Sequence, residues 1–268
     1  MKEHPILFSA PMVRAILSGQ KTQTRRPVTA QTAIVNGSAR VRPEVFARYP
    51  LDKAWVDQGP SPAGNRGPYL KVDSTHPDDD GAMVRLYSPW CAGDHLWVRE
   101  TWAELLAVSP STGEPLPITD GERLIEPPTS YVDARGNTRW HYDGTVIAYR
   151  ANSDIEFCDG DGFRGEQAND EDMPRWRPSI HMPRWACRLV LVVTDVRPQR
   201  LHQITEEDAL AEGVERFYDL FDGAPRKNEV QVFGTARDAF ADLWADTYGR
   251  ASWDANPWVW AVSFRRVV

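Results

Sequence analysis

The sequence concentrates cations and hydroxyl groups in one short run, GQKTQTRR, at residues 19–26. Guanidinium and ammonium groups make strong hydrogen bonds to phosphates, and hydroxyl groups both donate and accept. This composition therefore suits a phosphate or the polar edge of a nucleobase. A solvated strand end is the alternative, because basic clusters also occur on surfaces that bind nothing. The candidate site residues of the run are Lys21, Thr22, Thr24, Arg25 and Arg26.

Lys21 is the candidate base of this run. A lysine acts as a base or nucleophile when burial or neighbouring cations lower its pKa, and Arg25 and Arg26 are such cations. A hydroxyl such as that of Thr24 attacks a substrate only with the help of a base. Glu212 would complete a catalytic set, as a proton carrier or as the group that orients Lys21, provided that the fold brings the two together. Without that contact, Glu212 is an ordinary solvated glutamate.

Two further segments supply polar side chains. His181 and Arg184 lie in the proline-bounded segment PSIHMPRW, and Arg99 and Glu100 follow the alternating stretch HLWV. His181 suits proton transfer or stacking on a base, and a loop histidine bonded to a backbone carbonyl is the alternative. All four residues are candidates for substrate binding. Candidate stacking platforms, with core packing as the alternative, are Trp97, Trp185 and Trp253.

The basic run requires a helix before it and an extended segment after it. Ser9 and Pro11 predict a helix start, apolar residues then recur at helical spacing, and Gly19 predicts the helix end. The run therefore begins at a helix C-terminus and continues in extended form as far as Pro27.

Other elements are predicted from capping residues and periodicity. The segment TEEDALAEG predicts a short helix capped by Thr205 and stopped at Gly213, with Glu212 at its end. A longer helix is predicted over residues 235–248, before Gly249. Alternating or β-branched residues predict strands over residues 94–102, 188–194 and 258–264.

This inventory predicts an α+β fold, because strands and three short helices occur without regular strand–helix alternation. A small, partly open β-barrel with flanking helices fits best. Two stretches rich in turn-forming residues predict long irregular insertions, at about residues 27–88 and 103–177, the second with one strand at Thr145–Tyr149. We expect a single domain over residues 1–268, with its core in about residues 4–26, 90–102 and 178–268.

The composition limits the partners that this chain can have. A net charge of −7 argues against a protein that coats duplex DNA, so a nucleic-acid site has to be local. No apolar run approaches a membrane span of about 20 residues, and the first residues lack a secretory pattern, so we expect a cytoplasmic protein without membrane contact. Three widely spaced cysteines and the lack of Walker, GxSxG and HExxH motifs predict no disulfide framework, metal or cofactor.

Taken together, the segments SGQKTQTRR, HLWVRETW, ITEEDALAEGV and WVWAVSFRRV resemble the ASCH domain family, especially the versions carried by phages and prophages. The resemblance covers roughly residues 4–26, 90–102 and 178–268 and leaves out the two insertions. It implies a PUA-like β-barrel with a cleft that binds RNA or a modified nucleoside. The family motif G-x-K-T-x-T-x-R falls on Gly19, Lys21, Thr22, Thr24 and Arg26.

Some small members of this family are amidohydrolases that remove the acetyl group of N4-acetylcytidine with a lysine, a threonine and a glutamate. The matching positions are Lys21, Thr24 and Glu212, so the resemblance implies amide hydrolysis here. The chain departs from those enzymes by its two insertions, by Arg25 in place of an apolar residue, and by the HMPRW loop. These departures leave substrate size and activity open, since one fold hosts many functions.

Two classes of function therefore stay open. The first is an ASCH-type protein that binds RNA or a modified nucleobase, with or without amide hydrolysis. The second is a phage accessory protein that uses the barrel as a scaffold and binds a host protein through its insertions. Convergence of Lys21, Thr24 and Glu212 in one pocket would favour the first class, and scattered side chains would favour the second.

Overall fold

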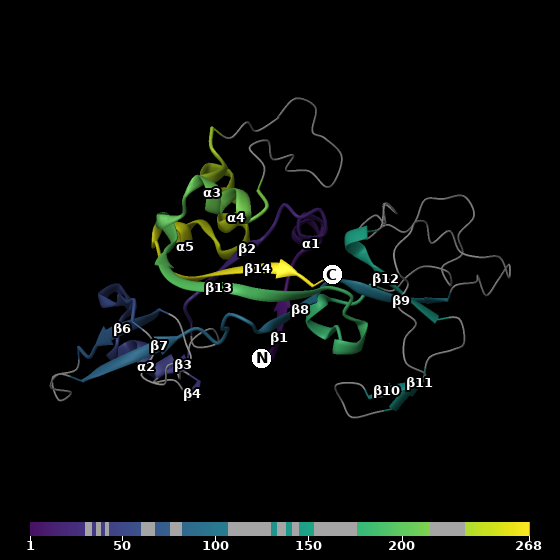
Figure 1. Cartoon of the computed structure of the whole chain (residues 1–268), viewed down its shortest axis with the longest axis horizontal. Coiled ribbons are helices and arrows are strands. Elements are labelled where there is room, and N and C mark those ends of the chain that lie inside the picture. The colour runs from purple at the N-terminus through teal and green to yellow at the C-terminus, as the bar shows by residue number, and fades with distance from the viewer. Residues whose placement is uncertain are drawn as a thin grey trace. The chain divides into compact units, whose positions relative to one another are not determined.

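The computed structural model describes residues 1–29, 34–35, 39–40, 43–59, 68–75, 82–106, 130–132, 138–140, 145–152, 176–214 and 234–267 (Figure 1). The chain divides into two compact units. Unit 1 comprises Met1–His4, Ala15–His95 and Leu191–Val268, and unit 2 comprises Pro5–Arg14 and Leu96–Val190. We describe each unit by itself, and the single-domain organisation stays a prediction.

The main sheet contains the strands predicted near both ends of the chain. Its order is β1 (Glu3–Leu7), β8 (His95–Arg99), β13 (Val190–Arg200), β14 (Trp258–Arg266) and β2 (Gln23–Pro27). β14 runs antiparallel to both β13 and β2, and a register shift between Val193 and Asp195 marks a bulge in β13. Among the described strands the order has two free ends and does not close. The α+β class is therefore confirmed, and the barrel stays a prediction.

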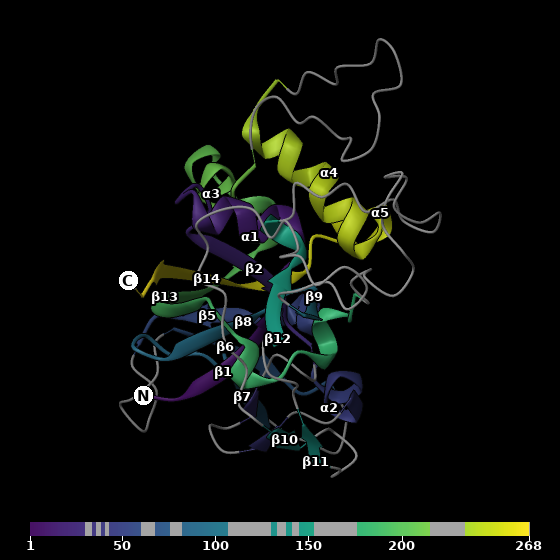
Figure 2. The same ribbon diagram turned by 90° about the vertical axis from the view of Figure 1, so that its right-hand side faces the viewer.

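Three helices lie on one side of β13 and β14 in unit 1, as both ribbon views show (Figures 1 and 2). These are α3 (Glu206–Ala211), α4 (Ala236–Tyr248) and α5 (Arg250–Asp254). The Thr205 and Thr235 side chains accept hydrogen bonds from backbone N–H groups at the starts of α3 and α4. The predictions for α3 and α4 are confirmed, including the stop at Gly249 with a φ of 87°; α5 was not predicted.

The helices cover the sheet through one apolar cluster. Its anchors are Phe240 and Trp244 from α4, both less than 4% exposed. Trp253 is partly buried and packs against the cluster. Of the two alternatives for this residue, the structure therefore favours core packing over a stacking platform. The buried members are Leu201, Ile204, Ala209, Val214, Ala236, Ala239, Phe240, Trp244 and Val259.

The prediction of an irregular insertion over residues 27–88 is wrong for the described part of this range, which contains a second five-stranded sheet within unit 1. Its order is β4 (Ala39–Arg40), β3 (Ile34–Val35), β7 (Met83–Tyr87), β6 (Tyr69–Asp73) and β5 (Trp55–Asp57), and α2 (Pro43–Arg48) follows β4 in the chain. Leu70 pairs with Leu86 and Val72 with Val84, all buried. Each of these strands is at most five residues long. The turn-forming residues between them therefore outnumber the short apolar segments and hide the strands in the sequence.

Unit 2 contains the described part of the second insertion. β9 (Trp102–Leu106) pairs antiparallel with β12 (Thr145–Tyr149), which confirms the strand predicted there, and β10 (Ser130–Val132) pairs with β11 (Thr138–Trp140). The predicted strand over residues 94–102 is two strands, β8 and β9. Most of the insertion lies outside the described residues.

A separate apolar cluster forms the core of unit 2. It joins β9 and β12 to two short turns of 3-10 helix at Ser179–His181 and Arg184–Ala186. Trp97 and Trp185 are partly buried and pack against this cluster, and the Trp102 and Trp185 rings meet edge to face at 5.8 Å. The buried members are Trp102, Ile147, Tyr149, Met182, Ala186 and Cys187.

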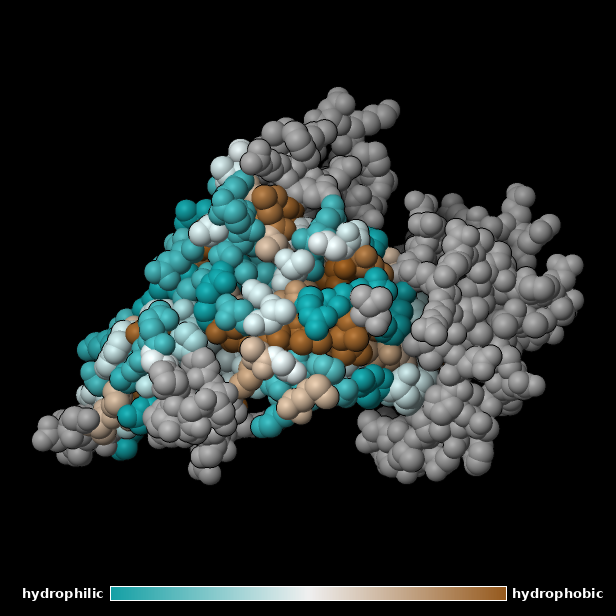
Figure 3. Space-filling model, in the orientation of Figure 1, coloured by the Kyte–Doolittle hydropathy of each residue, from teal (hydrophilic) through white to brown (hydrophobic). Residues whose placement is uncertain are grey.

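The described surface drawn in Figure 3 is mostly hydrophilic, with hydrophobic residues gathered near the middle of the view. Within the described ranges, no helix combines the length and the apolar character needed to cross a membrane. The described cysteines, Cys91 and Cys187, are free thiols.

Candidate functional site

The helix end at Gly19 brings the basic run to the end of α3. α1 (Ala10–Leu17) stops as predicted, and Gly19 adopts a φ of 80°, which favours glycine. Lys21 then forms an isolated antiparallel bridge with Glu212. The Thr22 backbone N–H donates to the Ala211 carbonyl at 2.8 Å. Backbone geometry therefore places Lys21 beside Glu212.

Lys21 and Glu212 form a buried ion pair. The Lys21 Nζ lies 2.7 Å from Glu212 Oε2 and also 2.7 Å from the Glu212 backbone oxygen. The Lys21 side chain exposes none of its surface and that of Glu212 exposes 4%. An ammonium group at the C-terminal end of a helix bonds a carbonyl that the helix leaves without a partner. The contact that the sequence left open is thus present.

Arg25 holds the other side of the Glu212 carboxylate. Its Nη1 donates to Glu212 Oε1 at 3.1 Å, and its Nη2 donates to Asp208 Oδ2 at 2.7 Å. The guanidinium carbon lies 5.7 Å from the centre of the Phe240 ring. One arginine therefore links two carboxylates that lie one helical turn apart on α3.

Asp208 collects polar partners from two strands. Arg197 of β13 donates to Asp208 Oδ1 at 2.6 Å, and the Gln23 amide donates to the same oxygen at 3.2 Å. The Gln23 oxygen in turn accepts a hydrogen bond of 2.6 Å from Arg25. We call the set Lys21, Gln23, Arg25, Arg197, Asp208 and Glu212 the Lys21 network.

Gly213 allows the close approach of α3 to the basic run. Its φ is 81°, and a Cβ at this position would lie 2.9 Å from the Lys21 Cβ and 3.0 Å from the Ala15 Cβ. Any side chain here would push Lys21 away. Gly213 thus ends α3 as predicted and also leaves the space that the ion pair occupies.

Burial lowers the pKa of Lys21, and this effect outweighs the opposing attraction of Glu212; the charges of Arg26 and Arg25 lower it further. The pKa of Asp208 is lowered as well, but here burial acts against the shift. Burial raises its pKa, but the hydrogen bond from Arg197 and the charges of Arg25 and Arg197 lower it by more, so the net pKa is below 3.8. At neutral pH, Asp208 is therefore a stable anion, while Lys21 loses its proton more easily than an exposed lysine.

Thr24 does not share a face with the Lys21 network. The side chains of Gln23 and Arg25 contact each other, so alternation along β2 directs Thr24 to the opposite face of the sheet. The Thr24 hydroxyl makes no hydrogen bond to Lys21 or Glu212 within the described part of the chain. Thr22 is exposed, and Arg26 is half-buried and donates to the Tyr248 hydroxyl at 3.3 Å.

The other candidate residues belong to unit 2. Glu100 is 1% exposed, and its two oxygens accept hydrogen bonds of 2.9 Å from Arg188, so it is an internal partner for a cation. Arg99 is half-buried, whereas His181 and Arg184 are exposed. Their predicted roles in substrate binding stay predictions.

Three members of the Lys21 network were missed in the sequence. Gln23 and Asp208 carried a signal: Gln23 stands two residues from both Lys21 and Arg25, and Asp208 stands one helical turn before Glu212. Arg197 gave none, because it lies in a strand far from the basic run in the chain.

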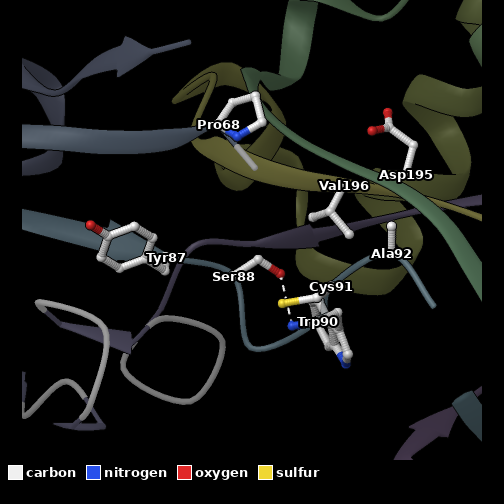
Figure 4. A pocket seen from close by; sticks show the side chains of 8 residues that line it. All are labelled: Pro68, Tyr87, Ser88, Trp90, Cys91, Ala92, Asp195 and Val196. Carbon is white, nitrogen blue, oxygen red and sulfur yellow. Dashed lines mark hydrogen bonds between the residues drawn. The ribbon is translucent and has the colours of Figure 1, made fainter. Parts of the chain in front are cut away.

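A small hollow of about 80 Å³ lies elsewhere in unit 1, beside β7 and β13 (Figure 4). The Ser88 hydroxyl in its wall accepts a hydrogen bond of 3.0 Å from the Trp90 backbone N–H. No member of the Lys21 network lines this hollow. Its lining residues are Pro68, Tyr87, Ser88, Trp90, Cys91, Ala92, Asp195 and Val196.

The Lys21 network therefore combines a lysine of lowered pKa, a carboxylate in hydrogen-bond contact with it, and an arginine that fixes this carboxylate. Such a set can exchange a proton between a buried amine and a buried carboxylate. Across the described ranges, no group of three His, Cys, Asp or Glu side chains is arranged to hold a metal ion. Comparison of the chain with family models, with curated proteins and with solved structures gave no match.

Proposed function

We propose that this chain is an ASCH-type protein with a PUA-like core that recognises a modified nucleobase and hydrolyses the exocyclic amide of N4-acylated cytidine. The four sequence segments quoted above support the family assignment. The contact between Lys21 and Glu212 carries the chemical part of the proposal, because the resemblance requires these two residues to act together.

The burial of the pair supports a role in proton transfer. An ordinary lysine is protonated near pH 7 and is a poor base, whereas burial lowers the pKa of Lys21. A structural ion pair also perturbs pKa values, so the lowered pKa alone does not define an enzyme. The second support is the pattern of residue types, since Lys21 and Glu212 stand at two of the three positions that the resemblance implies are catalytic.

In the proposed reaction, a water molecule gives a proton to the neutral amine of Lys21, and its oxygen attacks the acyl carbon. The bond between this carbon and the exocyclic nitrogen then breaks. The proton passes from Lys21 through Glu212 to the leaving nitrogen. The products are a carboxylic acid and cytidine, and Lys21 ends neutral, so no further reactant is needed. Water is the proposed nucleophile because Thr24 faces the other side of β2.

Access to the lysine is part of the proposal. The Lys21 side chain exposes no surface, so a substrate has to separate Lys21 from Glu212 or displace a neighbouring contact before it reacts. Arg25 keeps one oxygen of Glu212 bound during such a movement. The carboxylate would therefore stay in place while its contact with the lysine opens.

The test is a deacylation assay with N4-acetylcytidine and related N4-acyl cytidines. The rate is measured from the change in absorbance or from the amount of separated product. The matched variants are Lys21→Met and Glu212→Gln, and Lys53→Met is a control for the loss of a surface lysine. We expect turnover by the wild type and the control, and a loss of at least about 100-fold in both site variants. Equal rates in the wild type and Lys21→Met would overturn the proposal.

A non-catalytic interaction protein is the second candidate function. It is favoured by the ion pairs within the Lys21 network: all members except Arg197 are largely buried, and its cations pair with its carboxylates. In this case, the network stabilises the fold, and a host protein binds elsewhere, through the insertions. Folded wild-type protein that shows no turnover on any acylated cytidine would support this function.

A further inference from the structure

The two carboxylates of the Lys21 network are balanced by its two arginines before Lys21 is counted. Arg25 pairs with both Asp208 and Glu212, and Arg197 pairs with Asp208. Guanidinium groups stay protonated in proteins, so two fixed positive charges face two negative ones. A buried site tolerates an excess charge poorly. The network is therefore balanced when Lys21 is neutral, and it carries one excess positive charge when Lys21 is protonated.

Arg25 is held in place mainly from outside the ion pair of Lys21 and Glu212. Its Nη1 lies 2.6 Å from the Gln23 side-chain oxygen, and its Nη2 lies 2.7 Å from Asp208 Oδ2. Its contact with Glu212 Oε1 is longer, at 3.1 Å. The two short contacts fix the plane of the guanidinium group, whose donors have a rigid geometry. The hold of Arg25 on Glu212 therefore depends on Asp208 and Gln23.

Asp208 is itself fixed by its neighbours. Its backbone N–H donates to the Thr205 hydroxyl at 3.1 Å, at the start of α3. Arg197 and Gln23 both donate to its Oδ1, which leaves Oδ2 for Arg25. The Asp208 side chain exposes 15% of its surface and that of Arg197 exposes 38%. A chain of short contacts thus leads from the half-exposed Arg197 to the buried ion pair.

We propose that Asp208 is a positioning residue that holds Arg25 against Glu212. Glu212 then shares its charge between Arg25 and Lys21, so Lys21 can give up its proton without leaving the carboxylate unpaired. The inference rests on the proposed function, because it explains how the base of that reaction is kept neutral. It adds a residue outside the segment G-x-K-T-x-T-x-R and outside the three catalytic positions that the resemblance implies.

The positioning role and a simple charge effect predict opposite changes at Lys21. In the described part of the chain, the charged groups that act on Lys21 are Glu212, at the end of α3, and Arg25 and Arg26 of β2. Loss of the Asp208 charge alone would lower the pKa of Lys21, because a nearby negative charge favours the ammonium form. Release of Arg25 would raise this pKa, because Lys21 would become the main partner of Glu212. The sign of the change therefore separates the two roles.

The experiment is a double-mutant cycle of Asp208→Asn and Arg25→Gln in the deacylation of N4-acetylcytidine. We expect Asp208→Asn to lower kcat by about tenfold, less than the loss of the base itself, and to change KM by less than about twofold. In the Arg25→Gln background, Asp208→Asn should have no further effect, since a positioning residue acts only through the group that it holds.

Asp195→Asn is the matched control. Asp195 Oδ2 lies 3.6 Å from Arg197 Nη1, and its side chain is 57% exposed. This substitution removes a carboxylate from the same arginine that bonds Asp208, but Asp195 is not a bonding partner of Arg25 among the described residues. We expect Asp195→Asn to keep the kcat and the pH profile of the wild type.

A second readout needs no turnover. The side-chain signal of Lys21 in protein carrying 13C-labelled lysine is identified by its loss in Lys21→Met, and its pH titration is followed by NMR. In Asp208→Asn, the midpoint should move to higher pH by about one unit, the lower end of the effect of a neighbouring charge. The pH profile of kcat/KM should shift in the same direction.

Additive losses of kcat in the double variant, or a Lys21 midpoint that falls or stays unchanged in Asp208→Asn, would overturn the inference. A wild type without turnover would overturn the proposed function alone, because the NMR midpoint still reports how Arg25 is held on Glu212. If Asp208→Asn fails to fold, Arg197→Gln takes its place in the cycle. Arg197 is half-exposed, and its loss removes one of the contacts that fix Asp208.

Discussion

The Lys21 ammonium lies 2.7 Å from the Glu212 carboxylate, although 191 positions separate the two residues in the chain. Both side chains are buried, and Arg25 bonds the second oxygen of the same carboxylate. Removal of a charge from such an arrangement leaves its partners buried and uncompensated, which costs far more than the loss of a surface ion pair. The network can therefore be tested through stability as well as through activity.

Glu212→Gln should lower the free energy of unfolding by about 3 kcal/mol, because it leaves the Lys21 and Arg25 charges without their shared anion. Urea denaturation followed by tryptophan fluorescence measures this change. Glu44→Gln, at an exposed position of α2, is the control and should change stability by less than about 0.5 kcal/mol. Equal effects of the two substitutions would contradict a structural role of the ion pair.

Gly213→Ala should destabilise the protein more than Gly19→Ala. Both glycines have a φ near 80°, so alanine pays about 1–2 kcal/mol of backbone strain at either position. Only at Gly213 does the new Cβ meet other atoms, at 2.9 Å from the Lys21 Cβ; at Gly19 nothing lies within 4 Å. The difference between the two variants, measured by urea denaturation, isolates the steric effect on Lys21. Equal losses of stability in the two variants would mean that α3 moves away from the new Cβ without a measurable cost.

Arg25→Lys should be costly despite the conserved charge. One ammonium cannot reach Gln23, Asp208 and Glu212 as the planar guanidinium does, so about 1–3 kcal/mol should be lost. Arg26→Lys changes the adjacent, half-buried arginine and should cost less than about 1 kcal/mol. Thermal unfolding of the two variants provides the comparison, and a larger loss in Arg26→Lys would contradict the assignment of contacts.

Asp208 should make the protein sensitive to acid. Its folded-state pKa is lowered, so it contributes stability that is fully present above its usual pKa of 3.8 and is lost as the pH falls through the lowered value. Asp208→Asn should therefore reduce stability at pH 7 by about 2 kcal/mol. It should also weaken the decline of stability below about pH 4. Parallel stability curves for variant and wild type in that range would contradict the lowered pKa.

The local signals of the sequence predicted the elements around the network well. Gly19, Thr205, Gly213 and Thr235 act at helix ends as their residue types indicate, since capping depends on neighbouring backbone groups alone. The buried strand β14 was equally clear from its aromatic and β-branched residues.

Contacts between distant segments could not be predicted in the same way. The resemblance and residue chemistry suggested Lys21 and Glu212 as partners, but the addition of Arg197 depends on the packing of β13 beside α3, which no local pattern encodes. The second sheet was missed because its strands are short and separated by turn-forming residues, so long-range pairing decides the structure there. Strand alternation places Thr24 on the face of β2 opposite to Gln23 and Arg25. This could be deduced only once the structure showed that β2 begins at Gln23.

The most direct test of the account is the pH dependence of N4-acetylcytidine deacylation by the wild type and by Lys21→Met. Below its folded-state pKa, Lys21 is protonated and cannot accept a proton, so kcat/KM should rise with pH through a midpoint below 10.5. Lys21→Met should lose this rise together with the activity. A pH-independent rate, or turnover retained in Lys21→Met, would contradict the assignment of Lys21 as the base.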